Sequence, residues 1–334
     1  MKPRHICVLR VGAIGDVIHT LPLVNLLSQS FKERKITYAM DESLIDVMQF
    51  ARGIDQIFPI TLNGNIFNLL EQGKKLKKSA NGRFKTFINL QPNWKSKLIS
   101  KVISPELYFE YSKSSNFDEH VWQNFAESYY DSKDLEDYAI DQFFPLIRIP
   151  NEIVSSSAFK YELDEEKKLI GLVPGVGKHR PHRAWPIKNW LQFFKMIEER
   201  NNYKAHIVLI GGKDEIQLCD ELITHLPSYS KIRLTNLCGK SDLLETAAVL
   251  KRCDIAIGGD TGPIHLASAV GTEVICMFGP TSPSRHAPFT GLGIQASDDY
   301  ECAKACTPKK CARKVLNCME SLSPEEVWLA MNEV

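Results

Sequence analysis

The sequence lacks the features of a membrane-spanning or nucleic-acid-binding chain. No stretch of its 334 residues approaches the roughly 18 uninterrupted apolar residues of a membrane span. It begins with a strand-like run instead of a charged-then-apolar leader, so we expect a cytoplasmic protein without a transmembrane segment. The formal net charge is +1, from 41 Lys and Arg against 40 Asp and Glu, which predicts no nucleic-acid partner.

Internal repeats and low-complexity tracts are also absent, and the regular pattern that remains indicates two domains. Strand-like runs alternate with helical patterns from His5 to Tyr111 and again from Leu169 to Phe278. This alternation predicts an α/β fold of two Rossmann-like lobes, with parallel sheets whose strand ends face a cleft. The stretch 112–161 is less regular, and we therefore place the domains at 1–155 and 156–334.

Helical periodicity over 16–31 predicts one helix in the first domain, kinked by Pro22.

In the second domain, an apolar strand-like run is followed by Asp260–Ala267, which opens a helix of small residues. The unpaired N–H groups of a first helical turn, with the positive end of the helix dipole, hold a phosphate without a metal. Thr261 offers a hydroxyl and Gly262 allows close approach. An ordinary capped strand–helix junction is the alternative.

A second glycine loop of this kind lies near the N-terminus, over residues 11–16. Gly12 and Gly15 match a dinucleotide fingerprint only loosely, because its third glycine is missing and Asp16 stands at the helix start. A carboxylate there repels a pyrophosphate. Asp16 is interpreted either as a helix N-cap or as a general base.

Two further loops follow strands of the second domain. The first contains Gly175 and carries five potentially cationic side chains among the six residues from Lys178 to Arg183. Such a run is either a solvated surface or a device that neutralises phosphate charge. In the second loop, Gly212 precedes Glu215, whose carboxylate is a candidate acceptor for ribose hydroxyls.

Together these segments resemble glycosyltransferase family 9, the bacterial heptosyltransferases of lipopolysaccharide core assembly, which have two Rossmann-like lobes in the GT-B arrangement. The matching segments run in the family's order over nearly the whole chain: residues 9–22, 183–186, 211–215, 259–267 and 278–281. Two positions depart from the family pattern. Arg183 stands where a lysine is frequent, and Asn89-Leu90-Gln91 replaces Asp-Leu-Gln.

The resemblance implies inverting transfer of a heptose from ADP-heptose to an inner-core lipopolysaccharide sugar. It assigns the catalytic base to Asp16 and the cation at the leaving group to Arg183. For the ADP-sugar donor, the combined prediction is Gly12, Gly15, Gly175, Lys178, Gly212, Glu215, Asp260, Thr261, Gly262 and His265. For the glycolipid acceptor, at the cytoplasmic face of the inner membrane, the candidates are Gln91 and Lys95.

No Asp-x-Asp pair, the usual metal-binding motif, occurs in the chain. The negative charge that develops on the leaving phosphate would therefore be stabilised by cationic side chains and a helix N-terminus. We therefore expect catalysis without a metal cofactor. A sugar-nucleotide epimerase on the same fold and a non-catalytic nucleotide-sugar-binding module are the alternatives.

The lysines at 74, 75, 77 and 78 indicate either a solvated helix face or peripheral attraction to an anionic membrane.

The nine cysteines fall into two groups. Five are scattered through apolar segments and are expected to be free thiols: Cys7, Cys219, Cys238, Cys253 and Cys276. The other four form a compact C-terminal cluster that predicts either a structural zinc site or free thiols: Cys302, Cys306, Cys311 and Cys318.

Overall fold

The computed structural model describes residues 4–80, 84–112, 120–130, 144–164, 166–177, 183–199, 205–225, 232–279, 281–296 and 318–334. The chain divides into two compact units, Met1–Arg148 (unit 1) and Ile149–Val334 (unit 2). Each is built on a parallel sheet with helices, which confirms the α/β class. The boundary expected at 155/156 falls within helix α8 (Asn151–Lys160), which packs on α11 (Leu243–Arg252) of unit 2.

The sheet of unit 1 has the strand order β3-β2-β1-β4-β5. Its strands are β1 (Arg4–Leu9), β2 (Arg34–Met40), β3 (Gln56–Pro59), β4 (Phe84–Asn89) and β5 (Leu107–Glu110). The central strand β1 is buried from His5 to Leu9, as expected where helices cover both faces of a parallel sheet. The order reverses between β1 and β4, so their carboxyl ends form the point at which open parallel sheets bind ligands.

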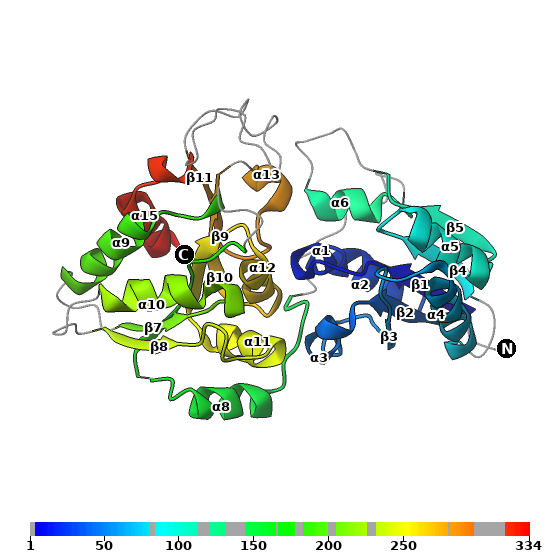
Figure 1. Ribbon diagram of the computed structural model, residues 1–334, viewed down its shortest axis with the longest axis horizontal. Helices are drawn as coiled ribbons and strands as arrows, with labels where there is room; N and C mark the ends of the chain where they lie inside the picture. Colours follow the sequence, from blue (N-terminus) through cyan, green and yellow to red (C-terminus); the bar gives the residue numbers. More distant parts are fainter. Residues whose placement is uncertain are drawn as a thin grey trace. The chain divides into compact units, whose positions relative to one another are not determined.

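Helices cover both faces of this sheet, with α4 and α5 on one face and α2 and α6 on the other (Figure 1). The helical segments are α1 (Ile14–Ile18), α2 (Leu21–Ser30), η1 (Glu42–Leu44), α3 (Ile45–Met48), α4 (Ile66–Ser79), α5 (Trp94–Ile103) and α6 (Val121–Ala126). Leu69 and Leu76 of α4 and Ile99 of α5 pack in one cluster with sheet residues such as Phe87. This cluster is the apolar core under the α4–α5 layer.

The single helix expected over 16–31 is wrong, because the structure has two helices there. α1 ends at Ile18 and α2 begins at Leu21, so Pro22 occupies the first turn of α2. A proline is well tolerated at this place, where its missing N–H has no intrahelical acceptor. The Thr20 hydroxyl donates to Val17 O at 2.7 Å in the connection. Pro22 therefore begins a helix instead of kinking one.

Unit 2 contains a six-stranded sheet in the order β11-β10-β9-β6-β7-β8. Its strands are β6 (Lys168–Val173), β7 (Ala205–Leu209), β8 (Arg233–Asn236), β9 (Ile255–Gly259), β10 (Glu273–Phe278) and β11 (Leu292–Gln295). The order reverses between β6 and β9, which places the ligand-binding point of this sheet at their carboxyl ends. Gly258 is required there, since a Cβ would lie 2.7 Å from Val173 O.

The helical segments of unit 2 also form two layers (Figure 1). Besides α8 and α11 they are α9 (Ile187–Glu199), η4 (Lys213–Glu215), α10 (Ile216–Thr224), α12 (Gly262–Ala269), α13 (Pro283–His286), η5 (Cys318–Ser321) and α15 (Pro324–Glu333). The large buried side chains Trp190, Phe193 and Trp328 join α9 to α15. The sequence pattern did not predict α8, β11, α13 or α15.

No helix among the described residues is both long and apolar enough to cross a bilayer.

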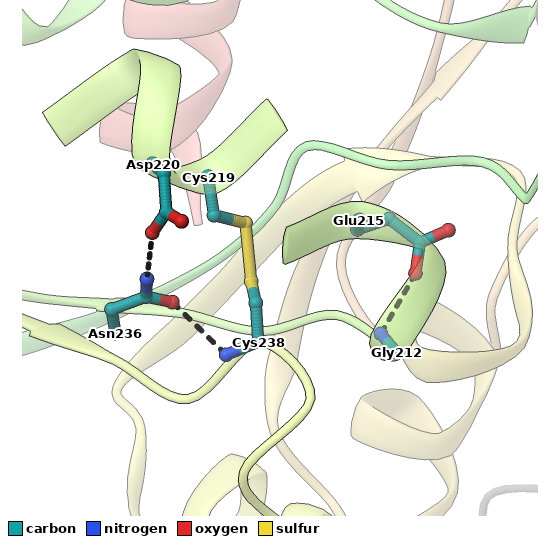
Figure 2. Close-up of a disulfide and its surroundings, with 6 residues drawn as sticks. All are labelled: Gly212, Glu215, Cys219, Asp220, Asn236 and Cys238. Carbon is teal, nitrogen blue, oxygen red and sulfur yellow. Dashed lines mark hydrogen bonds between the residues drawn. A yellow bond between two sulfur atoms is a disulfide. The ribbon is translucent and has the colours of Figure 1, made fainter. Parts of the chain in front are cut away.

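The expectation of five free thiols is confirmed for three cysteines and wrong for two. Cys7, Cys253 and Cys276 are buried free thiols. Cys219 of α10 and Cys238, which follows β8, form a disulfide (Figure 2). Sequence position could not reveal this pair, because only the fold brings α10 next to the end of β8.

We predict that non-reducing digestion of the denatured protein yields a cross-linked peptide containing Cys219 and Cys238. Cys219→Ser should lower the free energy of unfolding by about 3 kcal/mol, since the disulfide restricts a loop of intermediate length in the unfolded chain. Mass spectrometry and urea unfolding measure these two results, with Cys253→Ser as the buried-thiol control. Complete alkylation of both residues without a reductant would contradict the bond.

Candidate functional site

Asp260 lies at the centre of a buried polar network at the carboxyl end of β9. Its Oδ2 accepts from Arg183 Nη1 at 2.8 Å and from Thr281 Oγ1 at 2.9 Å. Its Oδ1 lies 3.0 Å from His265 Nε2 in a further hydrogen bond. The side chain of Asp260 is 8% exposed and that of Arg183 is 13% exposed. One carboxylate thus joins the loop after β6, the first turn of α12 and the loop after β10.

The surroundings of Asp260 keep it ionised. Burial alone would raise the pKa of this carboxyl, but the His265 hydrogen bond and the Arg183 charge outweigh burial and hold the pKa well below its usual range. His286, at the end of α13, is largely but not fully buried, and this burial lowers its pKa to about 4, so it is neutral at pH 7. The network therefore holds the negative carboxylate of Asp260 against the Arg183 guanidinium, with the neutral imidazole of His286 nearby.

Helix α12 begins beside this network without a side-chain cap. Thr261 is its N-cap residue, but the Thr261 hydroxyl donates to Gly259 O at 3.1 Å and not to the helix. In contrast, Asp242 caps α11 by accepting from Glu245 N at 2.8 Å. The first-turn N–H groups of α12, beginning at Gly262, thus have no side-chain cap and keep the character of an anion site.

Glu215 ties together two neighbouring strand ends in unit 2. Its Oε2 accepts from Gly212 N at 2.8 Å (Figure 2), and its Oε1 accepts from Gly177 N at 3.1 Å. Gly175 leaves room for this side chain, since a Cβ there would overlap Glu215 Cγ. Three residues predicted to bind the donor, Gly175, Gly212 and Glu215, are therefore brought together after β6 and β7.

In unit 1, Asp16 pairs with Arg10 at the carboxyl end of β1. Asp16 Oδ2 lies 2.7 Å from Arg10 Nη2, and Arg10 Nη1 donates to Leu90 O at 2.7 Å. Ala13 is the N-cap of α1, so the interpretation of Asp16 as an N-cap is wrong. The Asp16 side chain is 47% exposed, and Gly12 has open space around it. Arg10 thus fixes the direction of an accessible carboxylate.

The two candidate acceptor residues are held by hydrogen bonds to residues that are distant in the sequence. Gln91 Oε1 accepts from Val11 N at 2.9 Å, which links the end of β4 to the glycine loop after β1. Lys95 Nζ donates to Leu62 O at 2.6 Å. Asn89, which stands where the family pattern has an aspartate, is fully buried. Its amide donates to the Ser96 and Tyr108 hydroxyls at 3.0 Å each. Asn89 thus organises the start of α5.

Some predicted residues lie outside the described residues, namely Lys178, Cys302, Cys306 and Cys311. Among the described residues, no group of three or more His, Cys, Asp or Glu is arranged to hold a metal. The roles of Arg10, Thr281 and His286 were not predicted from the sequence. Arg10 and Thr281 stand inside matched motif segments and could have been found there, whereas His286 carries no sequence signal.

Comparison with known proteins identifies the family. The model of glycosyltransferase family 9 (heptosyltransferase) matches residues 73–316. The chain belongs to glycosyltransferase family 9. It is a glycosyltransferase, and its sheet topology with a ligand-binding point in each unit is consistent with that class.

Individual relatives in this family are distant in sequence but similar over their full length. Lipooligosaccharide heptosyltransferase 2 of Campylobacter jejuni is 23% identical over 94% of both chains. A family 9 glycosyltransferase of Veillonella parvula has a TM-score of 0.81 at 22% identity, covering 100% of this chain and 97% of its own. Escherichia coli ADP-heptose LPS heptosyltransferase II has a TM-score of 0.77 at 15% identity, covering 98% of each chain.

The lowered pKa of His286 predicts a pH dependence of stability. Its pKa is about 4 in the folded protein against 6.5 when unfolded, so the unfolded state binds the proton first as the pH falls. His286 therefore lowers the free energy of unfolding by about 2 kcal/mol between pH 7 and pH 5.

Urea unfolding at the two pH values measures this loss, and His286→Gln should reduce it. His225→Gln, at an exposed position in the same unit, is the control and should keep the wild-type pH dependence. An unchanged pH dependence in His286→Gln would contradict the assignment.

Proposed function

We propose that this chain transfers a heptose from ADP-heptose to an inner-core lipopolysaccharide sugar, with inversion and without a metal. The observation that carries the donor assignment is the pairing of Arg183 with Asp260 beside the uncapped first turn of α12. A cation and a helix N-terminus are both suited to a diphosphate. An Escherichia coli heptosyltransferase of the same fold, WaaC, has been solved with ADP and with ADP-2-deoxy-2-fluoro heptose, at TM-scores of 0.68 and 0.63.

In this proposal the residues around Asp260 divide the work of binding the leaving group. Arg183 and the N–H groups of α12 contact the diphosphate, and the Thr261 backbone and Gly262 permit its approach. Asp260 carries a negative charge that repels phosphate, so its role is to hold Arg183 and His265 in place. Glu215 keeps the loops that contain Gly175 and Gly212 in position for the nucleotide.

Asp16 is the proposed general base. The acceptor hydroxyl oxygen attacks the anomeric carbon of the donor, the bond from that carbon to the diphosphate oxygen breaks, and ADP leaves. Asp16 takes the hydroxyl proton, and a single displacement inverts the anomeric configuration. Arg10 occupies one carboxylate oxygen of Asp16, which leaves the other for the acceptor. Gln91, which accepts from the loop after β1, and Lys95, in the first turn of α5, are the proposed acceptor contacts.

Asp16→Asn should lower turnover by about 10²–10⁴-fold, the usual contribution of a positioned general base. The affinity for ADP should stay unchanged, because the proposed diphosphate contacts, Arg183 and the first turn of α12, lie in unit 2. Product formation from ADP-heptose and a core-truncated acceptor measures turnover, and Asp46→Asn, an exposed acid of the same unit, is the control. Near wild-type turnover in Asp16→Asn would contradict the role of Asp16 as the general base. Formation of an epimerised donor in the absence of acceptor would contradict glycosyl transfer itself.

Arg183→Ala should weaken ADP binding by roughly 1.5–3 kcal/mol, since it removes a charge-assisted contact to phosphate. Calorimetry measures the affinity, and Lys188→Ala removes an exposed cation of the same unit as the control. The melting temperature of each variant separates lost binding from lost folding, because Asp260 keeps His265 and Thr281 as partners. Turnover that EDTA abolishes and added magnesium restores would contradict the metal-free mechanism.

A further inference from the structure

The outer surface of α4 and α5 carries two stripes of aromatic and lysine side chains, here called the basic helix face. It consists of Phe67, Lys74 and Lys78 on α4 and Trp94, Lys97 and Lys101 on α5, all exposed. On α4 the two lysines follow Phe67 by seven and eleven residues, and on α5 the two lysines follow Trp94 by three and seven. These spacings place each stripe on one side of its helix. Phe67 is 81% exposed and Trp94 is 59% exposed.

The two stripes lie next to each other because α4 and α5 pack side by side in the same direction (Figure 1). Gly73 of α4 allows the close approach, since a Cβ there would lie 3.0 Å from the Val102 side chain of α5. Lys77 Nζ donates to Val102 O at 3.2 Å near one end of the pair, and Lys95 Nζ reaches Leu62 O near the other. Phe67 and Trp94 therefore share one end of the pair, and the exposed lysines follow.

Positive charge is concentrated on this helix pair, although the whole chain has a net charge of only +1. α4 and α5 contain seven lysines and one glutamate, Glu71. Glu71 pairs with Lys75 at 2.8 Å, and Glu110 pairs with Lys97 at 3.1 Å. Within the described part of the chain, Lys74, Lys78 and Lys101 belong to no salt bridge and remain available to an external anion.

We infer that the basic helix face docks on the surface of an anionic lipid bilayer. Lysines attract anionic headgroups, and exposed aromatic rings partition into the headgroup region. Neither feature alone selects a bilayer, but aligned aromatic and lysine stripes fit a surface that is both anionic and apolar.

Phe67 and Trp94 lie at the carboxyl edge of the sheet, the edge that also carries Asp16, because both helices begin there. Docking would therefore hold a lipid-anchored acceptor near the proposed base. This consequence rests on the proposed function, whereas docking itself does not.

Co-sedimentation of the full chain with vesicles that contain no glycolipid and no sugar nucleotide tests docking alone. The protein should bind vesicles of phosphatidylethanolamine and phosphatidylglycerol, bind pure phosphatidylcholine weakly, and dissociate as NaCl is raised. The triple variant Lys74→Gln, Lys78→Gln, Lys101→Gln should bind about 100-fold more weakly, at about five-fold for each lysine. The matched control removes three exposed lysines from unit 2 and should bind like wild type: Lys188→Gln, Lys195→Gln, Lys240→Gln.

Phe67→Ser with Trp94→Ser should also weaken binding while leaving the melting temperature unchanged, because both side chains are exposed. Equal vesicle binding by wild type and the triple variant would overturn the inference. So would self-association through this face, or capture of nucleic acid, without binding to anionic vesicles. Transfer to a water-soluble acceptor fragment is measured separately, so a failure of docking and a failure of the proposed function give different results.

Discussion

The buried carboxylate of Asp260 is the constraint on which the donor side of the structure depends. A charge in this position is stable only when several donors surround it, and the fold supplies them from three separate segments. Arg183 follows β6, His265 lies on α12, and Thr281 follows β10. Satisfying one carboxylate therefore fixes two loops and the start of α12 at the carboxyl ends of neighbouring strands. The same arrangement keeps a guanidinium close to the first turn of α12.

The two units use their ligand-binding points in different ways. In unit 1 an exposed carboxylate, Asp16, is oriented by Arg10, and the loop around it is tied to β4 through Gln91. In unit 2 the carboxylate is buried, and beside it lie the half-buried Arg183 and the uncapped first turn of α12. An accessible acid is suited to removing a proton, whereas a buried acid behind an arginine is suited to holding that arginine. The chemistry assigned to each unit follows from this difference in burial.

Much of the fold could be predicted from periodicity, because strands such as β1 and β6 are short apolar runs and helices such as α4 and α9 are amphipathic. Local glycine signals also located the ends of β1 and β9, and with them Asp16 and Asp260. Contacts between distant residues could not be predicted in this way. The Cys219–Cys238 bond and the approach of Thr281 and His286 to Asp260 depend on which strands become neighbours, which a single sequence pattern does not reveal.

Hydrogen exchange with and without ADP tests the central claim most directly, namely that unit 2 binds the donor diphosphate on the first turn of α12. With ADP saturation verified by calorimetry, the amides of Gly262 and Ile264 should exchange more slowly, because they donate to the bound phosphate. The first turn of α11, already capped by Asp242, is the internal control and should not change. Unchanged exchange at α12 with ADP bound, or protection confined to the glycine loop of unit 1, would contradict the account.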